Sequence, residues 1–463
     1  MPQIRSNATS TLLDLLKNSV CSFSSKTLFQ TDYFSITYCE FYNQVRALST
    51  FLSRFDRELV LVKSTNPINI AIAFFSIVLT NNIALLLDPS DEKLHLCYHN
   101  IRLILDDSTI EHHLNDGVQH YISEFPNIST QDVCVIIHSS GTSGSSKGIM
   151  LSQKNICSNA ISGLENYAAE AGERIINAIP YYHAFGLTAG LLAPIISGLT
   201  ICVLSHPTFF FQSLKSHKPT MVNVPPALAT ILLDLIDSGV SNSNIGIDSI
   251  TGGKLKKILC GGAPLDIETI ISFQEYGINV YGSYGLTECS PCVTINGEKY
   301  NKIGSSGFPL SCNKVLIASD GEILVSGDNV MVGYFEDDIL TKTVVYDGIL
   351  HTGDLGYIDS DGYLYVTGRK KNLIIFEDGR KCVPESLEKE IMHIPGVKEA
   401  LVKSIIISKR TYLIISVYMD NNYCNKSNVE LDIRMICSNY PIYTVEIRKK
   451  PFSKTLSGKI IRD

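Results

Sequence analysis

Short apolar runs alternate with helix-length segments along residues 58–282, and few folds accommodate such an arrangement. Five-residue runs rich in Val, Ile and Leu are typical of buried strands, and the longer segments between them have helical patterns. The alternation predicts an α/β fold class, with parallel sheets connected by crossover helices. The expected strands are ELVLV (58–62), IALLL (83–87), VCVII (133–137), TICVL (200–204), TMVNV (220–224), KKILC (256–260) and INVYG (278–282).

The pattern changes beyond about Pro291. The runs KVLIA, EILVS and YLYVT are separated by Ser-Asp-Gly turns at 319–321 and 360–362, which is typical of antiparallel strands. We expect a small antiparallel β unit that closes the large domain. The last segment, of about 90 residues, predicts a separate α+β domain with a helix at 385–394 and strands at 399–407 and 411–419.

The polar, glycine-bearing stretch GRKKN (368–372) is typical of a junction between domains. A chain of 463 residues is also too long for one compact core. The sequence therefore predicts an N-terminal domain over 1–368, a hinge at 369–372 and a small mobile domain over 373–463.

Charge and cysteine content narrow the class of protein. The net charge of −7 and the lack of basic runs argue against nucleic acid as a partner. The 13 cysteines have no framework spacing, and residues 1–53 contain no sustained apolar run, so we expect a cytoplasmic protein with reduced thiols. The pair Cys289 and Cys292 has no second ligand pair beside it, which favours pocket lining over a metal site. Asn81 and Asn82 divide the most apolar stretch, 68–89, into pieces too short to span a membrane.

The stretch HSSGTSGSSKG (138–148) follows a predicted buried strand and is rich in glycine and hydroxyl side chains. It differs from the nucleotide P-loop, because Ser146 stands where glycine precedes the lysine and Gly148 stands where a hydroxyl follows it. Its unhindered backbone amides, its hydroxyls and Lys147 could still surround a phosphate. Taken alone, such a stretch is also compatible with a flexible linker, the less favoured alternative.

The same stretch, with the residues that follow it, resembles the phosphate-binding signature of the adenylate-forming superfamily, which includes acyl-CoA synthetases, luciferases and adenylation domains. Ser146 replaces the proline usual in that family. Further family-like segments follow in the family's order and cover nearly the whole chain. They are PYYHAFG (180–186), CGGAPL (260–265), YGSYGLTE (281–288), GEILVSGDNVMVGY (321–334), HTGDLG (351–356), YVTGRKKNLII (365–375) and KTLSGKIIRD (454–463).

The resemblance implies roles for individual residues. Tyr284 would stack on adenine, Thr287 would contact the α-phosphate, and Thr142 and Glu288 would bind Mg²⁺. Asp354 would accept the ribose hydroxyls and Arg369 would add a ribose or phosphate contact. The complete ATP-binding set implied is Ser140, Gly141, Thr142, Ser143, Gly144, Lys147, Gly262, Ala263, Pro264, Ser283, Tyr284, Gly285, Asp354 and Arg369.

The resemblance also implies a catalytic set of Lys459, Thr287, Glu288 and His183. Lys459 would bridge the substrate carboxylate and the α-phosphate, whereas Lys371 falls at the family's hinge position. Without the resemblance, Lys459 would be an ordinary tail lysine and His183 a core histidine. The acyl pocket is expected to involve Tyr182, His183, Phe185, Asn223, Val224, Pro225, Gly282 and Ser283.

These roles imply an ATP- and Mg²⁺-dependent enzyme that activates a carboxylic acid as acyl-AMP and transfers the acyl group to coenzyme A. The phosphopantetheine thiol of an acyl carrier protein is an alternative acceptor. A catalytically inactive adenylate-binding protein on the same fold is a second alternative, which loss of Lys147, Glu288 or Lys459 would favour. Aryl, medium-chain and cyclic acids all fit the mixed aromatic and small side chains expected around the pocket.

Overall fold

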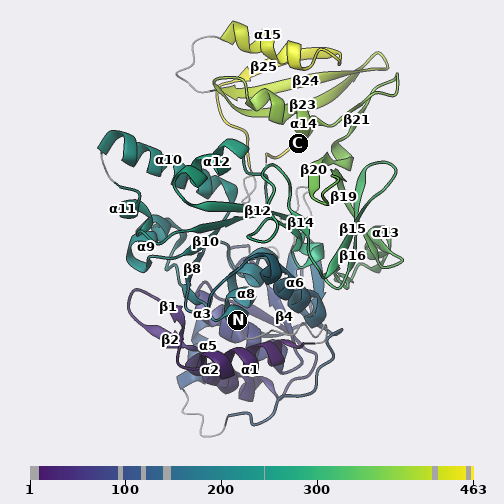
Figure 1. Cartoon of the computed structure of the whole chain (residues 1–463). Coiled ribbons are helices and arrows are strands. Elements are labelled where there is room, and N and C mark those ends of the chain that lie inside the picture. The colour runs from purple at the N-terminus through teal and green to yellow at the C-terminus, as the bar shows by residue number, and fades with distance from the viewer. Residues whose placement is uncertain are drawn as a thin grey trace. The chain divides into compact units, whose positions relative to one another are not determined.

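The computed structural model describes residues 10–91, 97–115, 121–138, 147–243, 246–419, 426–454 and 460–462. The chain divides into two compact units (Figure 1). The large unit comprises residues 1–315 and 325–350, and the small unit comprises 316–324 and 351–463. The boundary that the sequence predicts at 369–372 stays a prediction.

A nine-stranded sheet forms one half of the large unit. Its order is β14-β13-β12-β11-β10-β8-β9-β1-β2, and the six strands from β12 to β1 are parallel, as the alternation predicts. The edge strands β2, β13 and β14 pair antiparallel. The strands are β1 (Thr27–Gln30), β2 (Ser35–Thr37), β8 (Arg174–Asn177), β9 (Thr200–Cys202), β10 (Met221–Val224), β11 (Lys257–Cys260), β12 (Asn279–Gly285), β13 (Cys292–Ile295) and β14 (Phe308–Pro309).

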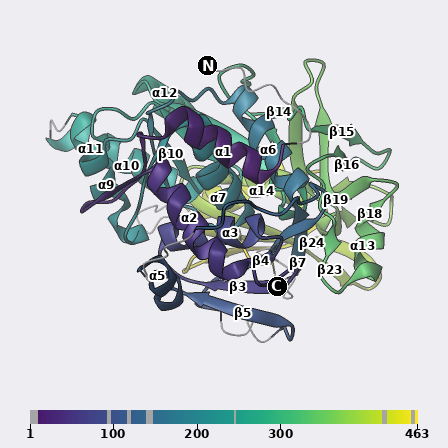
Figure 2. The same ribbon diagram turned by 90° about the horizontal axis from the view of Figure 1, so that it is seen from below.

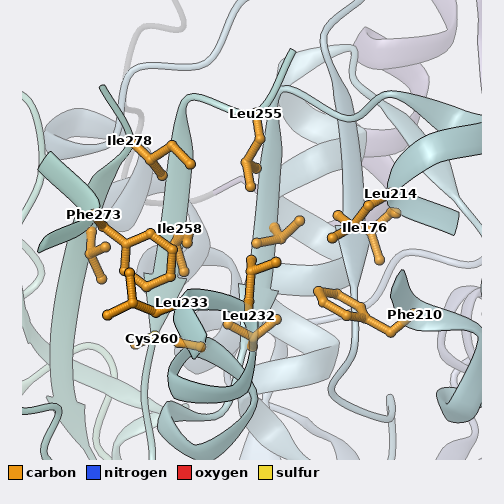
Figure 3. Close-up of a cluster of buried hydrophobic side chains, with 14 of the residues drawn as sticks. Ile176, Phe210, Leu214, Leu232, Leu233, Leu255, Ile258, Cys260, Phe273 and Ile278 are labelled. Atoms are coloured by element: carbon orange, nitrogen blue, oxygen red, sulfur yellow. The ribbon is translucent and has the colours of Figure 1, made fainter. Parts of the chain in front are cut away.

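Side chains alternate between the two faces of this sheet, and one face carries a large apolar core. Val222 and Val224 belong to this core, and each is fully buried. Ile258, Cys260 and Phe273 point into the same core (Figure 3). Helices α9 (Phe210–His217), α10 (Pro226–Ser243) and α12 (Ile267–Glu275) pack apolar side chains into the same core. The neighbouring strand residues Met221, Asn223 and Leu259 therefore face the opposite side.

A six-stranded sheet of order β17-β7-β6-β4-β3-β5 forms the other half of the large unit. Strands β6, β4, β3 and β5 are parallel, while β7 and β17 pair antiparallel. Helices α2 (Tyr38–Leu52) and α3 (Pro67–Leu79) pack side by side, and α3 contacts β3 and β4 of this sheet (Figure 2). The strands are β3 (Leu59–Lys63), β4 (Ile83–Leu86), β5 (Ile101–Asp106), β6 (Val133–His138), β7 (Gly148–Ser152) and β17 (Gly333–Tyr334).

Other helices of the large unit begin or end at residues typical of helix caps. Ser152 caps α6 (Gln153–Asn166) as predicted, with its side chain accepting from Asn155 N. Gly198 ends α8 with a φ of 74°, in the left-handed region that glycine favours. The others are α1 (Leu12–Phe23), α5 (Asp107–Asn115), α7 (Ala184–Leu187), the π-helix η1 (Thr188–Leu192), α8 (Ala193–Ser197), the 3₁₀ helices η2 (Pro207–Phe209) and η3 (Thr287–Cys289), α11 (Asp248–Thr251) and α13 (Asp338–Val344).

An antiparallel sheet of order β15-β16-β19-β18, with β20 on β19, contains the positions where the chain passes between units. This agrees with the antiparallel β unit predicted after Pro291. Its strands are β15 (Asn313–Ile317), β16 (Glu322–Gly327), β18 (Val345–Tyr346), β19 (Ile349–Ile358) and β20 (Leu364–Arg369).

The rest of the small unit is an α+β structure with its own apolar core around Ile391, Leu413 and Ile415. Strands β23 and β24 are antiparallel, and α15 connects β24 to the parallel strand β25. Its elements are the 3₁₀ helix η4 (Lys370–Asn372), β21 (Ile374–Ile375), β22 (Lys381–Cys382), α14 (Pro384–Met392), β23 (Val397–Ile407), β24 (Arg410–Met419), α15 (Lys426–Ile436) and β25 (Ile442–Arg448). Within the described part of the chain, no helix is long and apolar enough to cross a bilayer.

Candidate active site

Three side chains from distant parts of the large unit meet where the glycine-rich stretch enters β7. The Nζ atom of Lys147 lies 5.1 Å from the ring centroid of Tyr334. The hydroxyl of Tyr334 donates a hydrogen bond of 2.9 Å to Oε1 of Glu288. Strand pairing explains the proximity, since Tyr334 of β17 is opposite Ile149 of β7. The structure thus joins the predicted Lys147 and Glu288 through a buried tyrosine to which the sequence analysis gives no role.

Backbone contacts hold Glu288 in place within η3. Its carbonyl oxygen accepts from Met331 N at 2.9 Å, which ties η3 to the segment that leads into β17. The side chains of Thr287 and Glu288 are both half-buried. A half-buried carboxylate oriented by one phenol suits a hard cation, because Mg²⁺ prefers oxygen ligands and usually takes only one or two carboxylates from the protein. Ser140, Gly141, Thr142, Ser143 and Gly144, including the second predicted metal ligand, lie outside the described residues.

A tyrosine–histidine pair lies beside the residue that follows Lys147. The hydroxyl of Tyr98 and Nε2 of His138 are 2.5 Å apart. Burial lowers the pKa of His138 to about 4, so the imidazole is neutral near pH 7. A Cβ atom added to Gly148 would lie well inside van der Waals contact of the Tyr98 hydroxyl. The pair therefore packs tightly against the first residue of β7, and the sequence analysis assigns no role to either member.

The residues predicted at the adenine side lie at the ends of β11 and β12. Gly262 has a φ of 89°, so this turn after β11 requires a residue without a Cβ atom. Ser283 Oγ donates to the Cys260 carbonyl at 3.1 Å, which joins the two strand ends. Strand β12 continues through Gly282, Ser283, Tyr284 and Gly285, and Ala263 and Pro264 follow Gly262 in the turn.

Tyr182 and His183 adjoin each other at the start of α7. Their ring centroids are 4.9 Å apart, and His183 is the N-cap residue of the helix. Burial lowers the pKa of His183, although the charge of Asp88 opposes that shift. Burial, followed by the charge and hydrogen bond of Asp88, raises the pKa of Tyr182 to about 12. Asp88, for which the sequence predicts no role, is thus a carboxylate whose charge acts on both Tyr182 and His183.

A cavity of about 50 Å³ lies on the face of the nine-stranded sheet that is opposite the apolar core. Phe185 and Asn223, two of the residues predicted at the acyl pocket, line it, whereas Val224 points to the other face and packs in the core. Tyr182, His183, Gly282, Ser283 and Pro225 do not line it. The other lining residues are Asn159, Ala160, Gly163, Leu164, Tyr167, Ala169, Ile175, Thr188, Ala189, Ala193, Pro194, Leu199, Met221, Leu259, Pro291, Cys292 and Ile295.

In the small unit, Asp354 and Arg369 form an ion pair with Nε and Oδ1 2.7 Å apart. The two residues are opposite each other in the β19–β20 pair, and Asp354 is only 4% exposed. Glu322 supports the same turn, because it accepts from Gly353 N at 2.9 Å and pairs with Lys370 at 2.8 Å. Gly353, Arg369, Lys370 and Lys371 line a hollow of about 320 Å³. The predicted ribose-binding carboxylate therefore has a defined orientation, and Lys371 lies beside it.

Lys459 lies outside the described residues, but the residues on both sides of 455–459 are well anchored. Lys454 and Ile460 form an antiparallel bridge. Arg462 forms an ion pair with the buried Glu388 of α14 and donates to the Val402 carbonyl at 3.2 Å. These contacts fasten both ends of the segment that carries Lys459 to the small unit.

Known proteins share both the sequence pattern and the fold. The family model described as AMP-binding enzyme matches residues 91–335, which is more than half of the 463 residues. The chain belongs to the AMP-binding enzyme family. This confirms the family resemblance that the motifs indicate.

Two curated relatives illustrate the extent of similarity. The chain is 32% identical over 292 residues to a probable 4-coumarate–CoA ligase 3 of Dictyostelium discoideum, covering 59% of this chain and 51% of the relative. It is 31% identical over 299 residues to a 2-succinylbenzoate–CoA ligase of Bacillus licheniformis, covering 61% and 59%. The matched region thus spans between half and three-fifths of these relatives' own length.

Solved structures extend the similarity in fold to nearly the whole chain. ATP-bound MatB from Rhodopseudomonas palustris aligns with a TM-score of 0.83 at 20% identity over 96% of each chain. The o-succinylbenzoate coenzyme A synthetase MenE from Bacillus subtilis, in complex with AMP, aligns with a TM-score of 0.80 at 22% identity over 97% of each chain. These alignments confirm the predicted fold class, a large α/β part followed by a small α+β part.

Proposed function

We propose that this protein is an ATP- and Mg²⁺-dependent acid–thiol ligase that forms an acyl-adenylate and transfers the acyl group to coenzyme A. The observation that supports this function most strongly is the cluster of Lys147, Tyr334 and Glu288. It provides a cation and an oriented carboxylate beside the glycine-rich stretch. The matched relatives in the family are named as CoA ligases.

The first half-reaction brings two anions together, since a carboxylate oxygen attacks the α-phosphorus of ATP as pyrophosphate departs. Positive charge at the site lowers this barrier. We assign Lys147 to the β- and γ-phosphates, where it would neutralise the leaving pyrophosphate. We assign Lys459 to the α-phosphate and the attacking carboxylate. The lowered pKa of His183 favours the neutral imidazole, which would orient the substrate carboxylate by a hydrogen bond.

Glu288 would hold Mg²⁺ together with Thr142 and phosphate oxygens of the substrate. Bound there, the ion would act as a Lewis acid that withdraws charge from the phosphates. The hydrogen bond from Tyr334 presents the Glu288 carboxylate in one orientation. Asp354 would accept the ribose hydroxyls, and its ion pair with Arg369 keeps it in place.

The second half-reaction requires a thiol to attack the acyl carbon and release AMP. We propose that Lys371 belongs to a hinge that moves the Lys459 segment away before the thiol arrives. Coenzyme A is our preferred acceptor, because the relatives' names specify it. The phosphopantetheine arm of a carrier protein presents the same thiol and is the alternative.

Acid-dependent ATP–pyrophosphate exchange tests the first half-reaction. The experiment compares the wild type with Lys459→Ala over a panel of carboxylic acids. We expect the wild type to catalyse exchange with at least one acid. The exchange rate of Lys459→Ala should be lower by about 10²-fold or more. Undiminished exchange in Lys459→Ala would overturn the assignment of that lysine. Absence of exchange with every acid would favour the inactive adenylate-binding alternative.

A further inference from the structure

Helix α6 contains a glycine, Gly163, at a position where alanine would favour the helix more. Its backbone is that of a regular helix, since its φ is not in the left-handed region and its carbonyl accepts from Tyr167 N at 3.1 Å. A Cβ atom added to Gly163 would meet no described atom within 4 Å apart from the backbone of its own helix. Neither backbone conformation nor close packing therefore requires a glycine here.

Two glycines of the neighbouring helices α7 and η1 show the opposite situation. A Cβ atom added to Gly186 would overlap the Pro180 carbonyl oxygen. A Cβ atom added to Gly190 would overlap the side chain of Asn177. Close packing explains both of these glycines, whereas Gly163 has open space beside it.

The space beside Gly163 is the cavity on the face of the nine-stranded sheet that is opposite the apolar core. Gly163 is at the centre of the helix face that lines this cavity, and its main chain borders the cavity because glycine has no side chain. A side chain added at this position would therefore enter the cavity. The residues of α6 and its C-cap that line the cavity have the spacing of a single helix face, and they are Asn159, Ala160, Gly163, Leu164 and Tyr167.

The cavity extends along β11, from its carboxyl end to its amino end. Phe185 lies at the carboxyl end, because a Cβ atom added to Gly261, the residue after β11, would be 3.1 Å from Phe185 Cε1. Tyr167 lies at the amino end, where Nζ of Lys257, the first residue of β11, is 5.7 Å from its ring centroid. Gly163 precedes Tyr167 by about 6 Å of helix, so a side chain there would block the path towards Tyr167.

The lining also restricts the chemistry of the group that can enter. No charged side chain is among the described residues that line the cavity, and most of these residues are aliphatic or aromatic. A second carboxylate or an ammonium on the substrate would be buried without a counter-ion, which is strongly unfavourable. An apolar group, in contrast, gains free energy when it leaves water for such a cavity.

We infer that Gly163 determines the length of the acyl group that the protein accepts, and that the substrate is a carboxylic acid with an uncharged apolar chain. The chain would enter beside Phe185 and pass the main chain of Gly163 towards Tyr167. This inference rests on the proposed function, because it places the acyl group of the substrate in this cavity. It adds a specificity-determining residue to a site whose substrate class the sequence leaves open.

A graded series of straight-chain acids tests this role. We would measure kcat/KM for acid-dependent pyrophosphate exchange with butanoate, hexanoate, octanoate and decanoate, using the wild type, Gly163→Ala and Gly163→Leu. The wild type should prefer octanoate to butanoate by at least about tenfold. Gly163→Leu should lower kcat/KM for octanoate and decanoate at least about tenfold and leave butanoate within about threefold. Gly163→Ala should be intermediate, and octanedioate should be a poorer substrate than octanoate for the wild type.

Thermal stability separates a filled cavity from a damaged fold. Because alanine favours a helix more than glycine does, and its Cβ meets open space, the Tm of Gly163→Ala should not fall below that of the wild type. Glu165→Leu is the matched control for Gly163→Leu, since it adds the same side chain on the exposed face of α6 and should leave the chain-length preference unchanged. An unchanged preference in Gly163→Leu, or an equal loss of kcat/KM with every acid, would overturn the inference.

Calorimetry of acid binding separates this inference from the proposed function. Octanoate binding that Gly163→Leu weakens at least about tenfold, without exchange by the wild type, would retain the role of Gly163 and refute the ligase. Exchange with a chain-length preference that Gly163→Leu does not alter would retain the ligase and refute the role of Gly163. Neither binding nor exchange of any acid in the series by the wild type would refute both.

Discussion

Replacing Gly148 with alanine should disturb the base of the glycine-rich stretch in a way that a second substitution repairs. The added Cβ would overlap the Tyr98 hydroxyl and would lie 3.2 Å from both Ile136 Cγ2 and Phe335 Cβ. Overpacking of this kind typically costs 1–3 kcal/mol, so we expect Gly148→Ala to lower the free energy of unfolding by about 2 kcal/mol. Because Gly148 adjoins Lys147, pyrophosphate exchange should fall as well.

Tyr98→Phe removes the atom that the new Cβ would meet. Alone, it should cost about 1 kcal/mol, because the hydrogen bond to His138 is lost. If the two effects were independent, the double variant would lose about 3 kcal/mol. We expect it to lose only about 1–2 kcal/mol, since removing the hydroxyl relieves the overlap, which gives a coupling energy of at least about 1 kcal/mol.

The chain has no tryptophan, so urea unfolding would be followed by far-UV circular dichroism, with the first transition compared among the four proteins. Gly246→Ala is the control, because a Cβ there meets nothing within 4 Å. It should leave stability within about 0.5 kcal/mol of the wild type. Strict additivity of Gly148→Ala and Tyr98→Phe would refute the proposed packing around Gly148.

Three further predictions concern the contacts of Tyr334, His138 and Arg462. Tyr334→Phe removes the hydrogen bond to Glu288 and should raise the Mg²⁺ concentration for half-maximal exchange by roughly tenfold; an unchanged Mg²⁺ dependence would contradict the role of Glu288. The pKa of His138 is about 4 in the folded protein and ordinarily 6.5, so the unfolded chain binds the proton first and stability should fall as pH drops from 6.5 towards 4. Allowing for the partial exposure of His138, this group should lower the free energy of unfolding by about 1 kcal/mol between pH 7 and 5. His138→Gln should therefore flatten the dependence of Tm on pH in this range. A pH dependence of Tm equal to that of the wild type would contradict this prediction. Arg462→Ala removes the ion pair that joins one end of the Lys459 segment to Glu388. It should slow exchange at least about tenfold, while the affinity for ATP, measured by calorimetry, changes little. An equal loss of ATP affinity would argue for a general structural role of Arg462.

Local signals account for the parts of the fold that the sequence predicts well. Ser152 caps α6 because a serine before an amphipathic segment satisfies the free amides of the first turn. The parallel strands of the large unit follow from short apolar runs that must be buried on both faces. In contrast, the sequence does not predict β7, because its apolar residues directly follow the glycine-rich stretch and resemble a loop continuation.

The parts of the site that the sequence misses depend on pairings between distant segments. Tyr334 becomes part of the site only because β17 pairs with β7, and this register cannot be read from either strand alone. The partners of Tyr98 are likewise set by tertiary packing. Motifs therefore predict the phosphate-binding residues, while the neighbours that orient them become visible only in the structure.

We propose that the protein cleaves ATP between the α- and β-phosphates and so activates an acid for transfer to a thiol. A single-turnover reaction with ATP, Mg²⁺, coenzyme A and the best acid from the exchange panel tests it directly, with products identified by mass spectrometry. We predict AMP, pyrophosphate and the acyl-CoA thioester in equal amounts, with acyl-AMP accumulating when coenzyme A is omitted. Formation of ADP and phosphate, or of AMP without any dependence on the acid, would contradict the proposed function.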